Sequence, residues 1–545
     1  MKTRFFLTGF AACLFVSLNA QTRLPDEIAY KIKNEAFSNS KVEETAQWIT
    51  DFLGPRLAAS HNGLRAETLV KNKMEEFGLS NARREFAANF PKGGWNNERT
   101  YIALTAPYYT AFAATPKAWS GSTSGLVKGE AIYLNVEKEE DLRNYKGKLG
   151  GKIVLSPVTS TYAINFEPLA SRLTQERLDE IAKDPRGQQA PAFRQSRPAP
   201  NAALLQLRDK INQLLKEEKP LAVLSGNGTF NVPMSSGIQY VAGQPEPAPD
   251  ITLPIEDHGR LVRLVQKDIP VELELDIKNV FSPADSLIYN VIAEIPGTDP
   301  KLKNEVVLIG AHLDSWHGGT GGADNASGCI VMLEAMRIIK ATGVSPRRTI
   351  RIALWGGEEQ GLYGSRGYAQ NLLYDRKENI KLPDYDKFVL YLNMDNGSGR
   401  FRGIYLEEND MAVPFFKTWK EPFESLGFTT LSLRRTGSTD HVSFNTLGLP
   451  AYQFIQDGLE YGRTYHTLMD TYERLSLEDL RINAALVAWF ALNAANDNAR
   501  IPTKPGVLEN VRNVPLIRGH QQNPVFNLST LNPLKEGCLF ATLVA

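Results

Sequence analysis

The stretch Ala311–Gly328, AHLDSWHGGTGGADNASG, places His312, Asp314 and Asp324 in one glycine-rich turn. An apolar run, Val306–Ile309, comes directly before it. Short apolar runs bounded by turn residues are typical of buried strands. We therefore expect a histidine and two carboxylates where a buried strand ends.

The same arrangement recurs further along the chain. Glu358 and Glu359 follow the apolar run 350–355, Asp395 follows the run 388–392, and His466 lies in Tyr465-His466-Thr467. A lone histidine beside a strand is most often structural, but four of the seven histidines lie between residues 312 and 466. Burying several carboxylates together is costly without cations. Imidazole and carboxylate groups are ligands of zinc-class ions, and one carboxylate can bridge two of them. The pattern predicts a two-metal site and favours a hydrolase.

From residue 289 onward, strand candidates alternate with helical patterns. The strand candidates are 290–295, 306–310, 350–355, 388–395 and 451–455. Alternation of this kind predicts an α/β fold with a mixed, largely parallel central sheet flanked by helices. In such sheets ligands bind beyond the carboxyl ends of the strands. His312, Glu358, Glu359 and Asp395 all fall at that edge.

The 545 residues exceed what one hydrophobic core usually holds. Residues 119–275 contain short strand-like runs around a charged helical stretch, with no cluster of catalytic residue types. We expect a β-rich insert there, with residues 23–118 and 280–500 forming the catalytic domain. The tail, residues 501–545, is rich in turn residues and carries no clear pattern.

The N-terminus predicts export. Lys2 and Arg4 precede an apolar stretch from Phe5 to Leu18, which is typical of a signal peptide over residues 1–20. No later segment is long and apolar enough for a membrane span. The 61 basic and 61 acidic residues balance, so nothing indicates nucleic acid as a partner. We expect a periplasmic or extracellular protein.

Six motifs in order resemble the zinc aminopeptidases of family M28, in particular members with a protease-associated insert that are similar to carboxypeptidase Q. The motifs are AHLDSW, GADNASG, WGGEEQGLYGS, NMDNGSG, STDHVSF and YHTLMDT. The resemblance covers about 285–498 well. It is weaker in the N-terminal helices, where LGPRLAAS matches best, and diffuse in 119–275, where LRNYKGKLGGKIVL is the cue for the insert. It implies a peptide substrate.

The resemblance implies two Zn²⁺ per chain. His312 and Asp395 would hold one ion, Glu359 and His466 the other, and Asp324 would bridge them. Glu358 would be the general base, because consecutive side chains leaving a strand point apart. Asp314 would accept the second ring N–H of His312 and so fix its tautomer.

Substrate recognition is less constrained by the motifs. Asp440 and His441 would line the pocket or form a structural hydrogen-bonded pair, and Tyr465 would donate to the oxyanion. Arg435 and Arg463, with Arg434 nearby, offer forks for a C-terminal carboxylate. The carboxylate-rich site favours a substrate ammonium instead. We therefore predict an aminopeptidase first, a dipeptidase second and a carboxypeptidase third.

Two other classes of function stay open. A receptor-like protein on the same fold would lack metal ligands, and none is missing here. A glutaminyl cyclase binds one zinc ion and has no such insert, so it fits poorly. The sequence leaves the oligomeric state open, a homodimer included.

Overall fold

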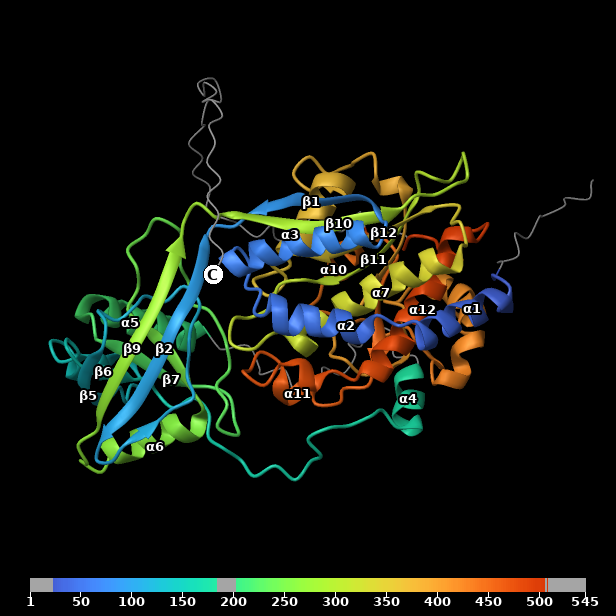
Figure 1. Ribbon diagram of the computed structural model, residues 1–545. Coiled ribbons are helices and arrows are strands. Elements are labelled where there is room, and N and C mark those ends of the chain that lie inside the picture. The colour runs from blue at the N-terminus through green and yellow to red at the C-terminus, as the bar shows by residue number, and fades with distance from the viewer. Residues whose placement is uncertain (1–22, 184–201, 505–506, 508–545) are drawn as a thin grey trace, which may run out of the picture. The chain divides into compact units, whose positions relative to one another are not determined.

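The computed structural model describes residues 23–183, 202–504 and 507, all within one compact unit (Figure 1). The predicted signal peptide, residues 1–20, and nearly all of the predicted tail lie outside the described residues. Among the helices of the described ranges, none is long and apolar enough to cross a membrane.

Eight strands form the first sheet, in the order β1-β10-β12-β11-β15-β18-β16-β17. Their bounds are β1 Ser80–Asn89, β10 Leu287–Ile295, β12 Thr349–Trp355, β11 Val306–His312, β15 Phe388–Asn393, β18 Ala451–Gln456, β16 Phe401–Tyr405 and β17 Thr430–Ser432. The pairs β12–β11, β11–β15, β15–β18 and β16–β17 are parallel, and the other three are antiparallel. The predicted fold class, a mixed and largely parallel sheet flanked by helices, is confirmed. Strands β1, β16 and β17 were not among the predicted strands.

Alternate side chains of the central strands enter two separate cores, because successive residues of a strand face opposite sides of the sheet. In β11, Val307 and Ile309 lie in the larger core, whereas Leu308 lies in the smaller one. In β12, Leu354 faces the larger core and Trp355 the smaller one. Burial on both faces explains why these strands are almost wholly apolar in sequence.

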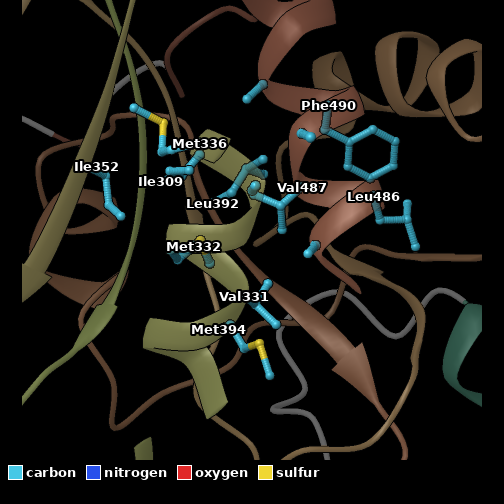
Figure 2. Close-up of a cluster of buried hydrophobic side chains, with 14 of the residues drawn as sticks. Ile309, Val331, Met332, Met336, Ile352, Leu392, Met394, Leu486, Val487 and Phe490 are labelled. Carbon is cyan, nitrogen blue, oxygen red and sulfur yellow. The ribbon is translucent and has the colours of Figure 1, made fainter. Parts of the chain in front are cut away.

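Helices supply the partner surfaces of both cores. The larger core takes apolar side chains from α1 Asp26–Ser38, α2 Val42–Gln47, α3 His61–Glu76, α7 Ser327–Thr342, α9 Val413–Trp419 and α12 Leu477–Asn496 (Figure 1). The smaller core takes Tyr368 from α8, Tyr363–Tyr368, and Phe444 from α10, Val442–Asn445. Figure 2 shows part of the larger core, where Met332 of α7, Ile309 of the sheet and Phe490 of α12 belong to one buried cluster.

A second sheet of eight strands has the order β3-β2-β9-β5-β6-β7-β8-β4. The bounds are β3 Thr110–Ala111, β2 Gly94–Ala106, β9 Glu272–Ser282, β5 Val127–Tyr133, β6 Ile153–Leu155, β7 Ala222–Gly226, β8 Asp250–Leu253 and β4 Thr115–Pro116. The long strands β2 and β9 pair antiparallel, the blue and yellow-green arrows of Figure 1. Helix α6, Ile255–Val265, packs against β7, and α5, Ala202–Glu218, precedes that strand. Since β2, β3 and β4 lie before residue 119, this sheet takes in more than the predicted insert; the domain boundaries stay a prediction. A two-stranded sheet pairs β13 Tyr374–Asp375 with β14 Ile380–Lys381.

One segment predicted as part of the insert packs against the first sheet. Helix α4, Gln175–Ala182, buries Leu178 and Ile181 in a cluster with Tyr405 of β16. Just before it, Arg172 lies between the buried carboxylates of Asp457 and Asp479, at 2.9 and 2.8 Å. Residues of the predicted insert therefore pack directly against the first sheet and its neighbouring elements.

We expect Phe490→Ala to lower the free energy of unfolding by about 3–5 kcal/mol, because it opens a cavity in the larger core. Phe490 is fully buried, whereas Phe166 is 90% exposed. The matched control Phe166→Ala should change the free energy by less than about 0.5 kcal/mol. Urea denaturation followed by tryptophan fluorescence measures both, and equal effects would contradict this description of the core.

Candidate metal centre

Four chain segments at the carboxyl edge of the first sheet bring together the five predicted ligands. His312 ends β11, Asp324 lies in the loop before α7, Glu359 follows β12, Asp395 follows β15, and His466 follows α11, Tyr461–Thr464. They form two groups, His312–Asp324–Asp395 and Asp324–Glu359–His466, each with ligand atoms within 4.8 Å of one another. The backbone of His466 is left-handed, with φ of 58°, a conformation that is uncommon outside glycine.

Asp324 belongs to both groups. Nε2 of His312 lies 3.1 Å from Oδ1 of Asp324 and 3.3 Å from Oδ1 of Asp395. Nε2 of His466 lies 3.1 Å from Oδ2 of Asp324 and 2.8 Å from Oε2 of Glu359. The two oxygens of Asp324 thus face different histidines, as a carboxylate must when it bridges two cations.

The donor set fits a pair of zinc-class cations, since all of its atoms are imidazole nitrogens or carboxylate oxygens. The five side chains are between 1% and 15% exposed. Oε1 of Glu359 is buried and has no hydrogen-bond partner among the described residues. A buried carboxylate oxygen without a partner is costly, and a bound cation would remove that cost.

The pKa values of Glu359 and His466 reflect their burial and the interaction of their opposite charges. Burial raises the pKa of Glu359 to about 7, against the opposing charge of His466. Burial by itself lowers the pKa of His466, but Glu359 and Asp324 raise it to about 10 overall. The ligand carboxylates and the two histidines therefore interact strongly, and divalent cations would offer the carboxylates another positive partner.

Glu358 comes from the same loop as Glu359 but belongs to neither ligand group. Burial raises the pKa of Glu358 well above its usual value, and the charges of Asp395, Asp440 and Glu359 add to this effect against that of His312. The carboxylate is therefore within electrostatic reach of the ligands without being one of them.

Asp314 holds the loop of the two glutamates. Its Oδ1 and Oδ2 accept hydrogen bonds from the backbone N–H groups of Glu358 and Glu359, at 3.0 and 3.2 Å. The predicted bond to His312 is made differently: Nδ1 of His312 lies 2.8 Å from the backbone oxygen of Asp314 and 3.8 Å from its carboxylate. The carboxylate is engaged by the two N–H groups, so the carbonyl is left to fix the His312 ring.

Sequence reasoning missed two buried residues that hold the Asp324 loop. Asp470 accepts hydrogen bonds from the backbone N–H groups of Ala323 and Asp324, at 2.6 and 3.0 Å. Arg56 donates to the carbonyl of Gly321 at 3.0 Å. Both lie within quoted motifs, YHTLMDT and LGPRLAAS, but the motifs give no hint of which backbone groups they bind.

Asp440 and His441 are both buried but have different surroundings. Nε2 of His441 lies 2.8 Å from Oγ1 of Thr436 and 3.4 Å from a carboxylate oxygen of Glu407. Burial raises the pKa of Asp440 to about 7, against the charge of His312. Asp440 is thus the member of the pair that interacts with the metal centre, and His441 bonds elsewhere.

Two tyrosines border the centre. The ring of Tyr465 stacks on that of His466, with centroids 3.5 Å apart. Burial, followed by the charges of Asp324 and Asp395, raises the pKa of Tyr461 well above its usual value. Tyr461 was not predicted, and nothing in its local sequence singles it out.

The arginines considered for a C-terminal carboxylate have other partners. Nε of Arg435 lies 3.6 Å from Glu408, and Nε of Arg463 donates to Glu460 at 3.0 Å. Arg434 donates to the backbone oxygen of Glu180 at 2.7 Å. The structure therefore does not bring these arginines together as a fork.

Chain from the second-sheet region also reaches the centre. The backbone N–H of Ser235 donates to the carbonyl of His466 at 2.7 Å. His317 lies 2.7 Å from the carbonyl of Pro116, and the ring of Trp316 contacts that of His466 with centroids 5.9 Å apart. The loop that carries His466 therefore contacts loops that connect strands of both sheets.

Comparison with known proteins agrees with this geometry. Residues 290–491 match the model of peptidase family M28. Carboxypeptidase Q of Mus musculus is 29% identical over 507 residues, which covers 91% of this chain and 95% of the relative. The match to carboxypeptidase Q of Xenopus laevis, also 29% identical, covers 48% of this chain and spans only about half, 51%, of that relative. A crystal structure of a peptidase M28 precursor from Shewanella amazonensis shares the fold, with a TM-score of 0.62 at 23% identity over 88% of this chain and 98% of that one. The matched region runs from β10 into α12 and carries all five clustered residues, so the chain is similar to the M28 peptidases in the part that holds the candidate metal centre.

Proposed function

We propose that the chain is an exopeptidase that binds two zinc ions and releases N-terminal residues from peptides. The observation that carries this proposal is the position of Asp324, whose two oxygens face His312 and His466 separately. The match of residues 290–491 to a peptidase family supports peptide bonds as the target.

His312 and Asp395 would hold one ion, Glu359 and His466 the other, with Asp324 shared. When bound, such ions polarise a carbonyl group and lower the pKa of water. Each ion would have three protein ligands, which leaves coordination positions open. Asp314 and Asp470 would keep the ligand loops in place through the backbone bonds described above.

Glu358 is the proposed general base. Its backbone N–H donates to Asp314, and its carboxylate interacts electrostatically with His312, Asp395 and Glu359 but lies outside both groups. The carboxylate accepts a proton from the attacking water as the new C–O bond forms. It then gives that proton to the leaving nitrogen as the C–N bond breaks. Tyr465, stacked on His466, is the proposed donor to the oxyanion, with Tyr461 as the second tyrosine at the centre.

Recognition of the amino terminus follows from charge. The carboxylates of Asp324, Glu358, Glu359 and Asp395 offer partners to an ammonium group, whereas Arg435 and Arg463 already pair with acidic residues. A dipeptidase or a carboxypeptidase is the second candidate, because the relatives of similar sequence are named carboxypeptidase Q. A silent receptor is disfavoured, since no predicted ligand is missing from the cluster.

Residues 119–275 are proposed to be a protease-associated insert, which the separate second sheet supports. Export remains proposed from residues 1–20, which lie outside the described part of the chain. Zinc is the expected ion because it suits the mixed imidazole and carboxylate donors.

We expect the wild-type protein to bind two zinc ions per chain, Asp395→Ala about one, and Asp324→Ala fewer than one, because only Asp324 serves both groups. Elemental analysis after dialysis against zinc and then buffer measures the content. Asp386, 80% exposed at the side chain, supplies the control Asp386→Ala, which should keep the full content. Equal losses for Asp324→Ala and Asp395→Ala would contradict the shared ligand.

Glu358→Gln should reduce kcat by about 10²–10⁴-fold, because it removes the group that carries the proton. Its zinc content should stay close to that of the wild type, since Glu358 is not a ligand. The neighbouring change Glu359→Gln is the matched comparison and should lower zinc content. An active Glu358→Gln enzyme, or equal zinc loss in both variants, would show that the roles are wrongly assigned.

N-acetylation of a tripeptide substrate should reduce kcat/KM by about 10- to 100-fold, because the ammonium loses its charge-assisted hydrogen bonds. C-amidation should leave kcat/KM nearly unchanged. The three forms, free, acetylated and amidated, are compared on the zinc-loaded enzyme. Activity that survives acetylation but not amidation would establish a carboxypeptidase, and loss in both would establish a dipeptidase.

A further inference from the structure

Arg56 is a buried cation that lies far in the sequence from the five ligands. It nevertheless binds the loop that connects His312 and Asp324. It is 1% exposed and lies between the helical turn Trp48–Leu53 and α3. Its guanidinium Nε donates to the carbonyl of Leu313 at 2.8 Å. Leu313 is the residue directly after His312.

The same guanidinium binds the other end of that loop. Nη1 donates to the carbonyl of Thr320 at 2.7 Å, and Nη2 donates to the carbonyl of Gly321 at 3.0 Å. Nη1 also donates to the carbonyl of Gly54 at 2.7 Å. A planar fork of five N–H groups is suited to holding several acceptors in fixed directions, which an ammonium group cannot do.

The middle of the loop is tied to Arg56 by its backbone. The N–H of Arg56 donates to Oγ of Ser315 at 3.0 Å, and the carbonyl of Arg56 accepts from the N–H of Ser315 at 3.2 Å. One residue therefore holds the loop at its start, middle and end. Asp470 binds the residues that follow this loop in the opposite sense, because its carboxylate accepts hydrogen bonds from the N–H groups of Ala323 and Asp324.

The positive charge of Arg56 is directed at backbone carbonyl groups. No ion pair within 4 Å joins it to a carboxylate in the described ranges, and its side-chain bonds go to backbone carbonyls. Burial lowers the pKa of Arg56, and the charges of Asp470, Asp314 and Asp324 are among those that oppose this effect. A buried cation among these acids offsets part of their repulsion while leaving their oxygens available to other partners.

We propose that Arg56 is a positioning residue of the metal centre, which fixes the 313–321 loop so that His312 and Asp324 converge before a cation binds. This inference rests on the proposed metal function and adds a residue to it. Arg56 acts through Leu313 and Gly321 and does not touch the cations or the substrate. Its loss weakens metal binding, because the ligands must then be ordered when the ion binds.

The test compares Arg56→Lys with Arg348→Lys. Arg348 is the control because it is also 1% exposed and donates to the backbone carbonyls of Ala494 and Asp497, away from the five ligands. Unlike Arg56, it also pairs with a carboxylate, that of Glu305 at 2.6 Å. Full-length metal-free protein is titrated with zinc against a chromophoric chelator, which gives the dissociation constant without any activity assay. Thermal melting of the same samples, and kcat and KM at saturating zinc, are measured alongside.

Arg56→Lys should bind zinc about 10- to 100-fold more weakly than the wild type, the usual effect of losing a residue that orients ligands. Arg348→Lys should lower Tm by a similar amount but leave the zinc dissociation constant unchanged. Saturating zinc should restore much of kcat in Arg56→Lys, with KM unaltered. These results together would support the positioning role.

Equal zinc affinity for Arg56→Lys and Arg348→Lys would overturn the role of Arg56 alone. An Arg56→Lys chain that fails to fold with or without zinc, while Arg348→Lys folds, would also overturn it, since Arg56 would then hold the fold and not the site. Absence of zinc binding by the wild type would overturn the metal centre itself and this role with it.

Discussion

The parallel strands of the first sheet all end at one edge, and acidic side chains accumulate there. Asp324, Glu359 and Asp395 are almost completely buried, so each charge has to be matched by a positive partner. The two histidines supply part of that match in the structure. Bound cations would supply it more completely, and the remaining features of the centre are arranged around this requirement.

Buried charges support the centre mainly through the backbone. Asp314 accepts N–H groups from the glutamate loop, Asp470 accepts N–H groups from the Asp324 loop, and Arg56 donates to carbonyls of the same loop. None of these residues competes for a ligand atom in the cluster. A division of this kind allows ligand oxygens to stay unpartnered by the protein, as Oε1 of Glu359 does, while their positions are still fixed.

Loops that connect strands of the second sheet contact residues near the first sheet. The backbone N–H of Ser235 donates to the carbonyl of His466. Arg172 lies between Asp457, which follows β18, and Asp479, which belongs to α12. Both contacts join chain from the predicted insert to elements of the peptidase region. Changes in the insert can therefore reach the metal centre through the His466 loop, by way of the backbone and not through the ligands' side chains.

The sequence by itself determined the central strands, the fold class and the candidate ligands. Apolar runs that end in glycine-rich turns encode strand and loop locally, and parallel strands then place His312, Glu359 and Asp395 at the same edge. Only the tertiary structure decided which groups support them. Arg56 binds Leu313, 257 residues later in the chain, and Arg435 and Arg463 lie beside the acidic side chains of Glu408 and Glu460. Local patterns record burial and backbone geometry, but hydrogen bonds to distant backbone carbonyls leave no mark on the sequence, because every residue type offers the same carbonyl.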